Sequence, residues 1–217
     1  DFGFYKYPEK YLNPVKLKRQ TDFAIKHADR IVVFSDYIFT ELIQRFPLQK
    51  NKIKRIYAGF DHLPQKSNEQ LDCRYFLYVG VIKPSKNIER LLRLFAVYRK
   101  TNENNQKLVI IGRAERGYWN NLKKKLWFKQ LKKFLVIKEN VSDQELADYY
   151  HQADAFLNLA LEEGFCYPVG EALQSGIPVL VNDLPLYREY LPYFPNLHIC
   201  RQDEDFLQLM VDLPDRI

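Results

Sequence analysis

The chain has 217 residues, of which 47% are hydrophobic and 15% aromatic, and its 33 Lys and Arg against 27 Asp and Glu give a net charge of +6. This composition excludes a disordered chain of low hydrophobicity, a collagen-like chain and a low-complexity repeat, and the length is enough to bury a core. The positive charge, with a pI near 9.0, predicts an anionic partner: a nucleotide diphosphate, an acidic membrane surface or a nucleic acid.

Targeting and redox signals are weak. The longest apolar runs, such as residues 31–34 and 179–181, are far shorter than the roughly 18 to 20 residues that cross a bilayer. Residues 1–8 lack the basic start, apolar stretch and cleavage site of a signal peptide, and the only Met is Met210, so we expect a piece of a longer chain. The chain has three cysteines, Cys73, Cys166 and Cys200, which are widely spaced and form no CxxC pair. This odd number and spacing predict neither a disulfide framework nor a zinc site and favour a reducing compartment.

Strand and helix patterns alternate along the chain. Runs that are apolar on consecutive positions predict buried parallel strands at 30–35, 75–80, 107–112, 134–138, 155–160 and 178–181, with weaker candidates at 53–57 and 197–200. Apolar residues at helical spacing predict helices at 87–100, 119–133, 143–152 and 168–175. This alternation predicts an α/β fold with a doubly wound parallel sheet, whose ligands lie beyond the carboxyl ends of the strands.

The chain divides at a polar stretch. The apolar pattern stops over residues 61–72, which predicts a linker. Residues 73–217 carry the strand signals of one complete Rossmann-like unit. Residues 1–60 carry two strands and two or three helices, too few for a second closed sheet, and are therefore expected to be the end of a partial second α/β domain.

Glycines mark the ends of predicted strands. Only eight are present, yet Gly80 and Gly112 each close a strand and Gly164 is expected to open a helix. A glycine at a strand-to-helix turn lets backbone N–H groups approach an anion. Lys86 follows at the predicted start of the next helix, where its ammonium and the helix N-terminus can share a diphosphate. A single lysine in a turn is otherwise a solvated side chain.

Two glutamates flank the predicted start of a later helix. Pro168 suits its first turn and Gly176 its end, which places Glu163 in the preceding loop and Glu171 about one turn inside. Both carboxylates are then expected to face the cleft at the strand ends, where they can accept hydrogen bonds from sugar hydroxyls. In isolation, two glutamates eight residues apart would be capping or surface charges.

In context, these residues resemble a known family. The spacing from Glu163 to Glu171, preceded by residues 141–154, resembles the donor-binding half of family 4 retaining glycosyltransferases with the GT-B fold. Residues 78–87 resemble that family's strand and "RKN" turn, with Ser85 where Arg is common. Residues 27–35 and 58–61 resemble the last strands of its acceptor-binding half. The segments occur in order and with matching spacing between about residues 17 and 195.

The resemblance implies roles for individual residues. Lys86 would bind the donor diphosphate, Glu171 the ribose hydroxyls and Glu163 the transferred sugar, so Glu163 and Lys86 are the implied catalytic pair. The family is generally metal-independent, so no metal or cofactor is expected, and cations and oriented N–H dipoles stabilise the departing nucleoside diphosphate. The other implied donor-binding residues are Gly80, the backbone N–H groups of Gly164 and Phe165, and Val141, whose loop 139–141 would flank the base.

The sequence also departs from the family's pattern. Many members carry Arg directly after the strand glycine, whereas this chain has Val81, so Arg113 or Lys83 would have to compensate. Cys166 and Tyr167 replace the more usual Gly and Leu, which is expected to alter the donor pocket. The resemblance also implies an N-terminal acceptor domain of roughly 150 or more residues, a normal domain size, and we expect nearly all of it to be missing from this sequence. The family's usual returning helix at the C-terminus is likewise expected to be cut short.

Other classes have less support. The segment from Gly112 to Gly117 fails as a dinucleotide-binding GxGxxG and as a P-loop, and the four histidines, each expected to be structural or exposed, have no metal-ligand spacing. Residues 203–205 mimic a metal-binding DxD but suit an acidic helix start. One stretch is strongly basic and also contains aromatic residues: Lys123, Lys124, Lys125, Lys129, Lys132 and Lys133, interleaved with Trp119, Trp127 and Phe128. The favoured interpretation is a solvated helix face with its aromatic side chains in the core. The alternatives are contact with an anionic membrane and nucleic-acid binding.

The resemblance implies a hexosyltransferase of polysaccharide biosynthesis that acts with retention. The donor is a nucleotide sugar, and the turn after Gly80 favours mannosyltransferases and GDP-mannose. The acceptor is a glycan or a lipid-linked glycan, and no nucleic-acid partner is expected. The protein is predicted to be cytoplasmic, with peripheral contact at the inner face of the membrane. The alternative is an inactive donor-binding fragment or a subunit that needs a partner for its acceptor half, and a sugar-nucleotide epimerase of the same fold is a more distant reading.

Overall fold

A fully parallel sheet of six strands forms the centre of the molecule in a computed structural model that describes residues 2–69, 73–102 and 105–213. The order is β5-β4-β3-β6-β7-β8, so the chain winds outward from β3, returns to the middle at β6 and winds outward again. This confirms the predicted doubly wound α/β fold and places the topological switch point between β3 and β6. The strands are β3 (Tyr75–Val79), β4 (Lys107–Ile111), β5 (Leu135–Lys138), β6 (Ala155–Asn158), β7 (Val179–Asn182) and β8 (Leu197–Cys200).

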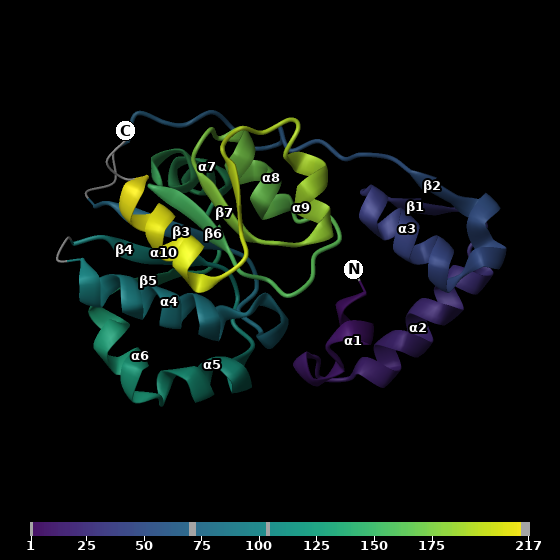
Figure 1. The fold of residues 1–217 in the computed structure, drawn as a ribbon, viewed down its shortest axis with the longest axis horizontal. Helices are drawn as coiled ribbons and strands as arrows, with labels where there is room; N and C mark the ends of the chain where they lie inside the picture. Colours follow the sequence, from purple (N-terminus) through teal and green to yellow (C-terminus); the bar gives the residue numbers. More distant parts are fainter. Residues whose placement is uncertain (1, 70–72, 103–104, 214–217) are drawn as a thin grey trace.

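Helices cover both faces of this sheet (Figure 1). Along β3, Phe76 and Tyr78 enter one core with α4, α5, α6 and α10, whereas Tyr75 and Leu77 enter the other with α7, α8 and α9. Both faces of the central strands are therefore buried, which explains why their residues are apolar at consecutive positions. The helices are α4 (Ile88–Thr101), α5 (Arg116–Lys123), α6 (Leu126–Leu131), α7 (Asp143–Gln152), α8 (Tyr167–Gln174), α9 (Pro185–Tyr190) and α10 (Asp203–Asp212), with short 3-10 turns η3 (Pro84–Lys86) and η4 (Lys132–Phe134).

The single helix predicted over 119–133 is wrong, because the chain forms α5 and α6 with a break between them. At about 100° per residue, positions nine apart lie on opposite sides of a continuous helix. Trp119 and Phe128 are nine apart, yet both are buried and their rings meet edge to face at 5.2 Å. An extended backbone at Lys125, with φ −71° and ψ 139°, breaks the helix and turns both aromatic side chains toward the same core.

The N-terminal segment has its own small core beside the main sheet (Figure 1). Its two strands pair in parallel, Ile31 opposite Ile53. Its elements are α1 (Gly3–Lys6), η1 (Pro8–Lys10), α2 (Pro14–His27), β1 (Ile31–Val33), α3 (Asp36–Arg45), η2 (Pro47–Lys52) and β2 (Ile53–Arg55). Residues 56–69, which include most of the predicted linker at 61–72, contain neither helix nor strand, and residues 70–72 lie outside the described residues. None of the described helices is long and apolar enough to cross a membrane.

Candidate functional site

The candidate site is a cavity at the switch point, where the turn after β3 faces the loop after β6. Leu161 donates its backbone N–H to the carbonyl oxygen of Ser85 at 3.1 Å and thereby joins the two segments. The cavity has a volume of about 240 Å³ and opens at the carboxyl ends of the strands, where ligands of open parallel sheets bind. Its lining residues are Tyr78, Val79, Gly80, Lys86, Asn158, Glu163, Cys166, Tyr167 and Pro168.

Lys86 and Glu163 form an ion pair inside this cavity. The Lys86 Nζ lies 2.6 Å from Glu163 Oε1, and the Glu163 residue is only 5% exposed. Burial acts to lower the pKa of Lys86, but the Glu163 carboxylate, together with Cys166 and Tyr11, acts to raise it. The net effect places the pKa above its ordinary value, so the ammonium stays charged. The structure therefore brings the two implied catalytic residues together, and among the described residues that line the cavity Lys86 is the one cation.

The turn that carries Lys86 depends on its backbone. Lys86 ends η3 two residues before α4, rather than starting that helix as predicted, and Asn87 between them is left-handed with φ 55°. Gly80 and Gly112 follow directly after β3 and β4 with φ of 146° and 147°, a region that side chains disfavour. A Cβ on Gly112 would also overlap the carbonyl oxygen of Gly80. The two glycines therefore let the strand ends approach each other beside the cavity.

Glu171 lies apart from the cavity lining. It is buried one turn into α8, where its carboxylate accepts a hydrogen bond from the Tyr150 hydroxyl at 2.6 Å and lies 3.1 Å from His62 Nε2. Burial and the nearby carboxylate raise the pKa of Tyr150 well above its ordinary value, so the hydroxyl remains a donor. The expectation that both carboxylates face one cleft is therefore met by Glu163 alone, since Glu171 is occupied by neighbours within the described chain.

Tyr150 and His62 were not predicted as site residues. Tyr150 lies on the inner face of α7 and His62 in the connection after β2, so no sequence spacing links either of them to Glu171. His62 was expected to be structural or exposed. Its side chain is half exposed, and it contacts Glu171, the residue implied to bind the ribose hydroxyls. The available signal was a tyrosine within the predicted helix 143–152, because the hydroxyl of a tyrosine whose ring is buried usually needs a hydrogen-bond partner.

The loop before α8 is held by its carbonyl oxygens. Gly164 does not open the helix as expected, because α8 begins at Tyr167 after a left-handed Cys166 with φ 59°. The Ser35 hydroxyl donates to the Gly164 carbonyl at 2.7 Å, and the Tyr190 hydroxyl donates to that of Phe165. Within the described part of the chain, the N–H groups of Gly164 and Phe165 have no acceptor, so both remain available beside Glu163.

Aromatic side chains pack the N-terminal segment against this loop. The Phe60 ring stacks on that of Phe165 with centroids 4.9 Å apart, and the Phe34 ring lies 5.5 Å from the same ring. Gly170 of α8 permits this arrangement, since a Cβ there would overlap the Phe60 ring. The loop that carries Glu163 therefore lies between α8 and the segment that contains α3.

Cys166 and Tyr167, the two positions that depart from the family's usual Gly and Leu, form one wall of the cavity. The Asn158 side-chain amide donates to Cys166 Sγ at 3.2 Å. Burial, together with the Glu163 carboxylate, raises the pKa of the Cys166 thiol, which therefore stays neutral. Cys166 and Tyr167 thus give the cavity a small neutral group and an aromatic edge where the family more often has Gly and Leu.

The residues expected to compensate for Val81 lie outside the cavity lining. Arg113 is exposed, with its carbonyl oxygen bonded to the Ile82 N–H. Burial and the neighbouring Lys86 lower the pKa of Lys83, whose ammonium lies 5.9 Å from the centre of the Tyr11 ring. Val141, expected near the base, packs half-buried against the core of α7, α8 and α9.

Metal-ligating groups do not gather in the described part of the chain, where no three His, Cys, Asp or Glu side chains form a cluster. The acidic residues at 203–205 start α10, as predicted. Asp205 accepts the N–H groups of Arg201 and Gln202, and Asp203 pairs with Arg90 at 2.7 Å. The three cysteines are free thiols.

Solved structures share this fold. The structure of Anabaena HepE in complex with UDP and glucose superposes with a TM-score of 0.73 at 18% identity, over 94% of this chain and 58% of that chain. The structure of WaaG, a glycosyltransferase involved in lipopolysaccharide biosynthesis, gives a TM-score of 0.66 at 14% identity, over 86% and 54%. The fold is therefore that of the GT-B glycosyltransferases, of which the chain represents a part.

Sequence comparison adds the family. The family model described as glycosyl transferases group 1 matches residues 59–195, more than half of the chain, and the chain belongs to this family. The O-antigen chain mannosyltransferase RfbU of Salmonella typhimurium is 27% identical over 224 residues, covering all of this chain and 61% of that protein. The serotype-specific mannosyltransferase WbdA of Escherichia coli is 31% identical over 115 residues, 52% of this chain and 14% of that protein. The chain thus spans about three fifths of RfbU, and the resemblance found in its sequence is confirmed.

Proposed function

We propose that this chain contains the donor-binding domain of a retaining glycosyltransferase that moves a sugar from a nucleotide diphosphate to a glycan or lipid-linked acceptor. Residues 73–217 would bind the donor, residues 61–72 would link the domains, and residues 1–60 would belong to the acceptor-binding domain. The observation that carries the proposal is the Lys86–Glu163 pair, 2.6 Å apart in a cavity at the switch point of a doubly wound sheet.

The chemistry follows from the charges in this cavity. Sugar transfer leaves a nucleoside diphosphate, and its developing charge is stabilised by a fixed cation and by oriented N–H groups. Lys86 supplies the cation, and the N–H groups of Gly164 and Phe165 supply the dipoles. When the diphosphate takes over the Lys86 ammonium, Glu163 is released to accept hydrogen bonds from the hydroxyls of the sugar.

The nucleoside would bind farther along α8. Glu171 accepts from Tyr150, and its second oxygen faces His62, whose side chain is about half exposed. Ribose hydroxyls would displace His62 and keep Tyr150 as the residue that orients the carboxylate. Val141 would then border the base.

We further propose mannose as the transferred sugar and GDP-mannose as the donor. The relatives RfbU and WbdA are named as mannosyltransferases, and the turn after Gly80 agrees with this assignment. The protein would act in the cytoplasm, in peripheral contact with the inner face of the membrane where its acceptor is lipid-linked.

Calorimetric titration with GDP, UDP, ADP and their sugars, with and without Mg²⁺, tests the donor site. We expect one nucleotide to bind with micromolar, metal-independent affinity. Because a hydrogen bond to a charged group contributes about 1.5 to 3 kcal/mol, Lys86→Ala should weaken that binding by roughly ten- to a hundredfold. Lys83→Ala is the matched control, since Lys83 lies in the same turn but not in the lining, and it should change affinity by less than threefold. Absence of binding to every nucleotide would contradict the proposal.

A further inference from the structure

The excess of positive charge is concentrated in one part of the chain. Residues 116–138 contain eight Lys and Arg and no Asp or Glu, which leaves 25 basic against 27 acidic residues elsewhere. This stretch forms α5, α6, η4 and β5, and Figure 1 shows α5 and α6 on the outer side of α4. The cavity at the switch point uses none of its lysines.

The two helices point their basic side chains outward. Their buried side chains are Trp119, Leu122, Phe128 and Leu131, which pack toward α4 and the sheet. Of the six lysines at 123–133, only Lys125 has a carboxylate within 4 Å among the described residues, namely Glu89 at 2.6 Å. The remaining five are exposed and unneutralised, and with one leucine they form what we call the basic face: Lys123, Lys124, Leu126, Lys129, Lys132 and Lys133.

Leu126 distinguishes this surface from a merely solvated one. It is the first residue of α6, is 74% exposed and stands between Lys124 and Lys129 in the chain. An apolar side chain within a cluster of cations suits a lipid surface, because the cations attract anionic headgroups and the apolar group enters the acyl boundary.

The aromatic residues of the same stretch argue against a nucleic acid. Strand binding relies on exposed aromatic rings on which bases stack. Trp119 and Phe128 are buried against each other, and the Arg93 guanidinium covers the Trp127 ring at 4.9 Å. The basic face therefore offers charge and one apolar side chain, without an exposed ring for stacking.

We propose that the basic face docks on an anionic lipid surface, with its lysines over the headgroups and Leu126 inserted between them. This deepens the membrane contact included in the proposed function by assigning it residues. The two proposals fail separately, because binding to vesicles requires no nucleotide and calorimetry of the donor requires no lipid.

Co-sedimentation of the full chain with vesicles tests the proposal. We expect binding to phosphatidylcholine vesicles that contain 30% phosphatidylglycerol, loss of that binding at high salt, and no binding to pure phosphatidylcholine. Each lysine near an anionic surface contributes about a fivefold factor in partitioning, so Lys123→Gln, Lys124→Gln and Lys129→Gln together should weaken binding about a hundredfold. Leu126→Asn should weaken binding severalfold and leave its salt dependence unchanged.

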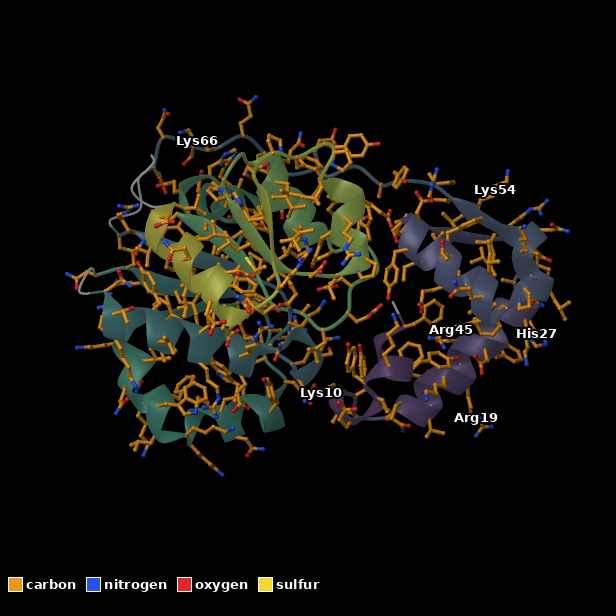
Figure 2. All side chains as sticks on the ribbon, in the orientation of Figure 1. Lys10, Arg19, His27, Arg45, Lys54 and Lys66 are labelled. Atoms are coloured by element: carbon orange, nitrogen blue, oxygen red, sulfur yellow. The ribbon has the colours of Figure 1, made fainter. Side chains whose placement is uncertain are left out.

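Matched controls lie in the N-terminal segment. The triple variant Lys26→Gln, Lys50→Gln and Lys54→Gln removes the same charge from exposed lysines, and Figure 2 shows Lys54 across the molecule from α5 and α6. Leu48→Asn is the control for Leu126, since Leu48 is also exposed. An equal loss in the two triple variants overturns the assignment to the basic face. Absence of binding to anionic vesicles, or salt-dependent binding to a single-stranded oligonucleotide in its place, overturns the lipid partner.

Discussion

At the scale of single residues, Glu163 and Glu171 differ in their surroundings. Glu163 faces the cavity and neutralises Lys86, whereas Glu171 is held by Tyr150 within the protein. The first is therefore placed to report on what occupies the cavity, and the second on the nucleoside that we propose binds along α8.

Two alanine variants test this division of roles. Glu171→Ala should weaken the binding of GDP and of GDP-mannose by the same factor. We expect about tenfold, because hydrogen bonds to a charged acceptor are lost. Glu163→Ala should chiefly abolish the preference for the sugar nucleotide over GDP. Calorimetric titration of both ligands into each variant checks this, and equal losses in both variants would mean that the roles are misassigned.

Gly112 permits a second prediction about a single residue. Gly112→Ala should lower the free energy of unfolding by about 2 kcal/mol or more, because the left-handed backbone disfavours a side chain and the new Cβ overlaps the Gly80 carbonyl. Gly117→Ala is the control, since it lies in α5 with open space around it and should be neutral or stabilising by about 0.5 to 1 kcal/mol. Urea denaturation measures both, and equal effects would contradict this account.

At the scale of elements, the eight strands of the described residues could be predicted to within two residues. The signal is clearest for β3, β4, β6 and β7, because burial on both faces leaves a local mark, a run of consecutive apolar residues. The break between α5 and α6 was missed because residues 123–125 are three lysines, with neither Gly nor Pro to signal it. The pairing of Trp119 with Phe128 shows the cause, which lies in tertiary packing. The same reason explains which site residues could be predicted. Lys86 and Glu163 follow strands that are recognisable in the sequence, whereas His62 contacts Glu171 from a connecting segment that has no helix or strand pattern.

Helix α7 anchors that connection through Asp148. Its carboxylate accepts from the Ser67 N–H at 2.6 Å and from the Ser67 hydroxyl at 2.9 Å, and the backbone hydrogen bond is the main reason that the pKa of Asp148 is lowered. A folded-state pKa below the unfolded value of about 3.9 adds stability above that pH, and this stability is lost as the pH falls through the folded-state pKa.

The pH dependence of unfolding follows from this sign. Between pH 6 and pH 3, the urea midpoint of the wild-type chain should fall more steeply than that of Asp148→Asn. Asp143→Asn is the control, since the Asp143 carboxylate makes no hydrogen bond within the described residues and its slope should match the wild type. Identical slopes for all three chains would remove Asp148 as a source of the effect.

At the scale of the whole molecule, the N-terminal segment and the large sheet meet through polar contacts. Glu189 of α9 accepts the N–H groups of Asp36 and Tyr37, at 2.9 and 2.6 Å, and so caps α3 from outside its own segment. Glu162, directly before Glu163, is buried and accepts from the Tyr37 hydroxyl and from Lys6. The two segments thus supply each other's buried polar partners.

Removal of the external cap should loosen this junction. Glu189→Ala removes the charged acceptor of two half-buried N–H groups of α3 and should speed hydrogen exchange of the Asp36 and Tyr37 amides roughly tenfold or more, in keeping with about 1.5 to 3 kcal/mol for a hydrogen bond to a charged group. Exchange within β3 should not change. Glu204→Ala, on the exposed first turn of α10, is the control, and unchanged exchange at Asp36 and Tyr37 in Glu189→Ala would contradict the capping role.

The bond from Ser35 to the Gly164 carbonyl has a further consequence. The loop that it holds carries Glu163, which would face the proposed donor, so a ligand that fixes this loop and a ligand that fixes the N-terminal segment would act on a shared equilibrium. Thermodynamic reciprocity then requires each to change the affinity for the other by the same factor. Donor titrations of the wild type and Ser35→Ala, with and without acceptor, measure that factor, and an acceptor effect that persists unchanged in Ser35→Ala would assign the coupling to other contacts.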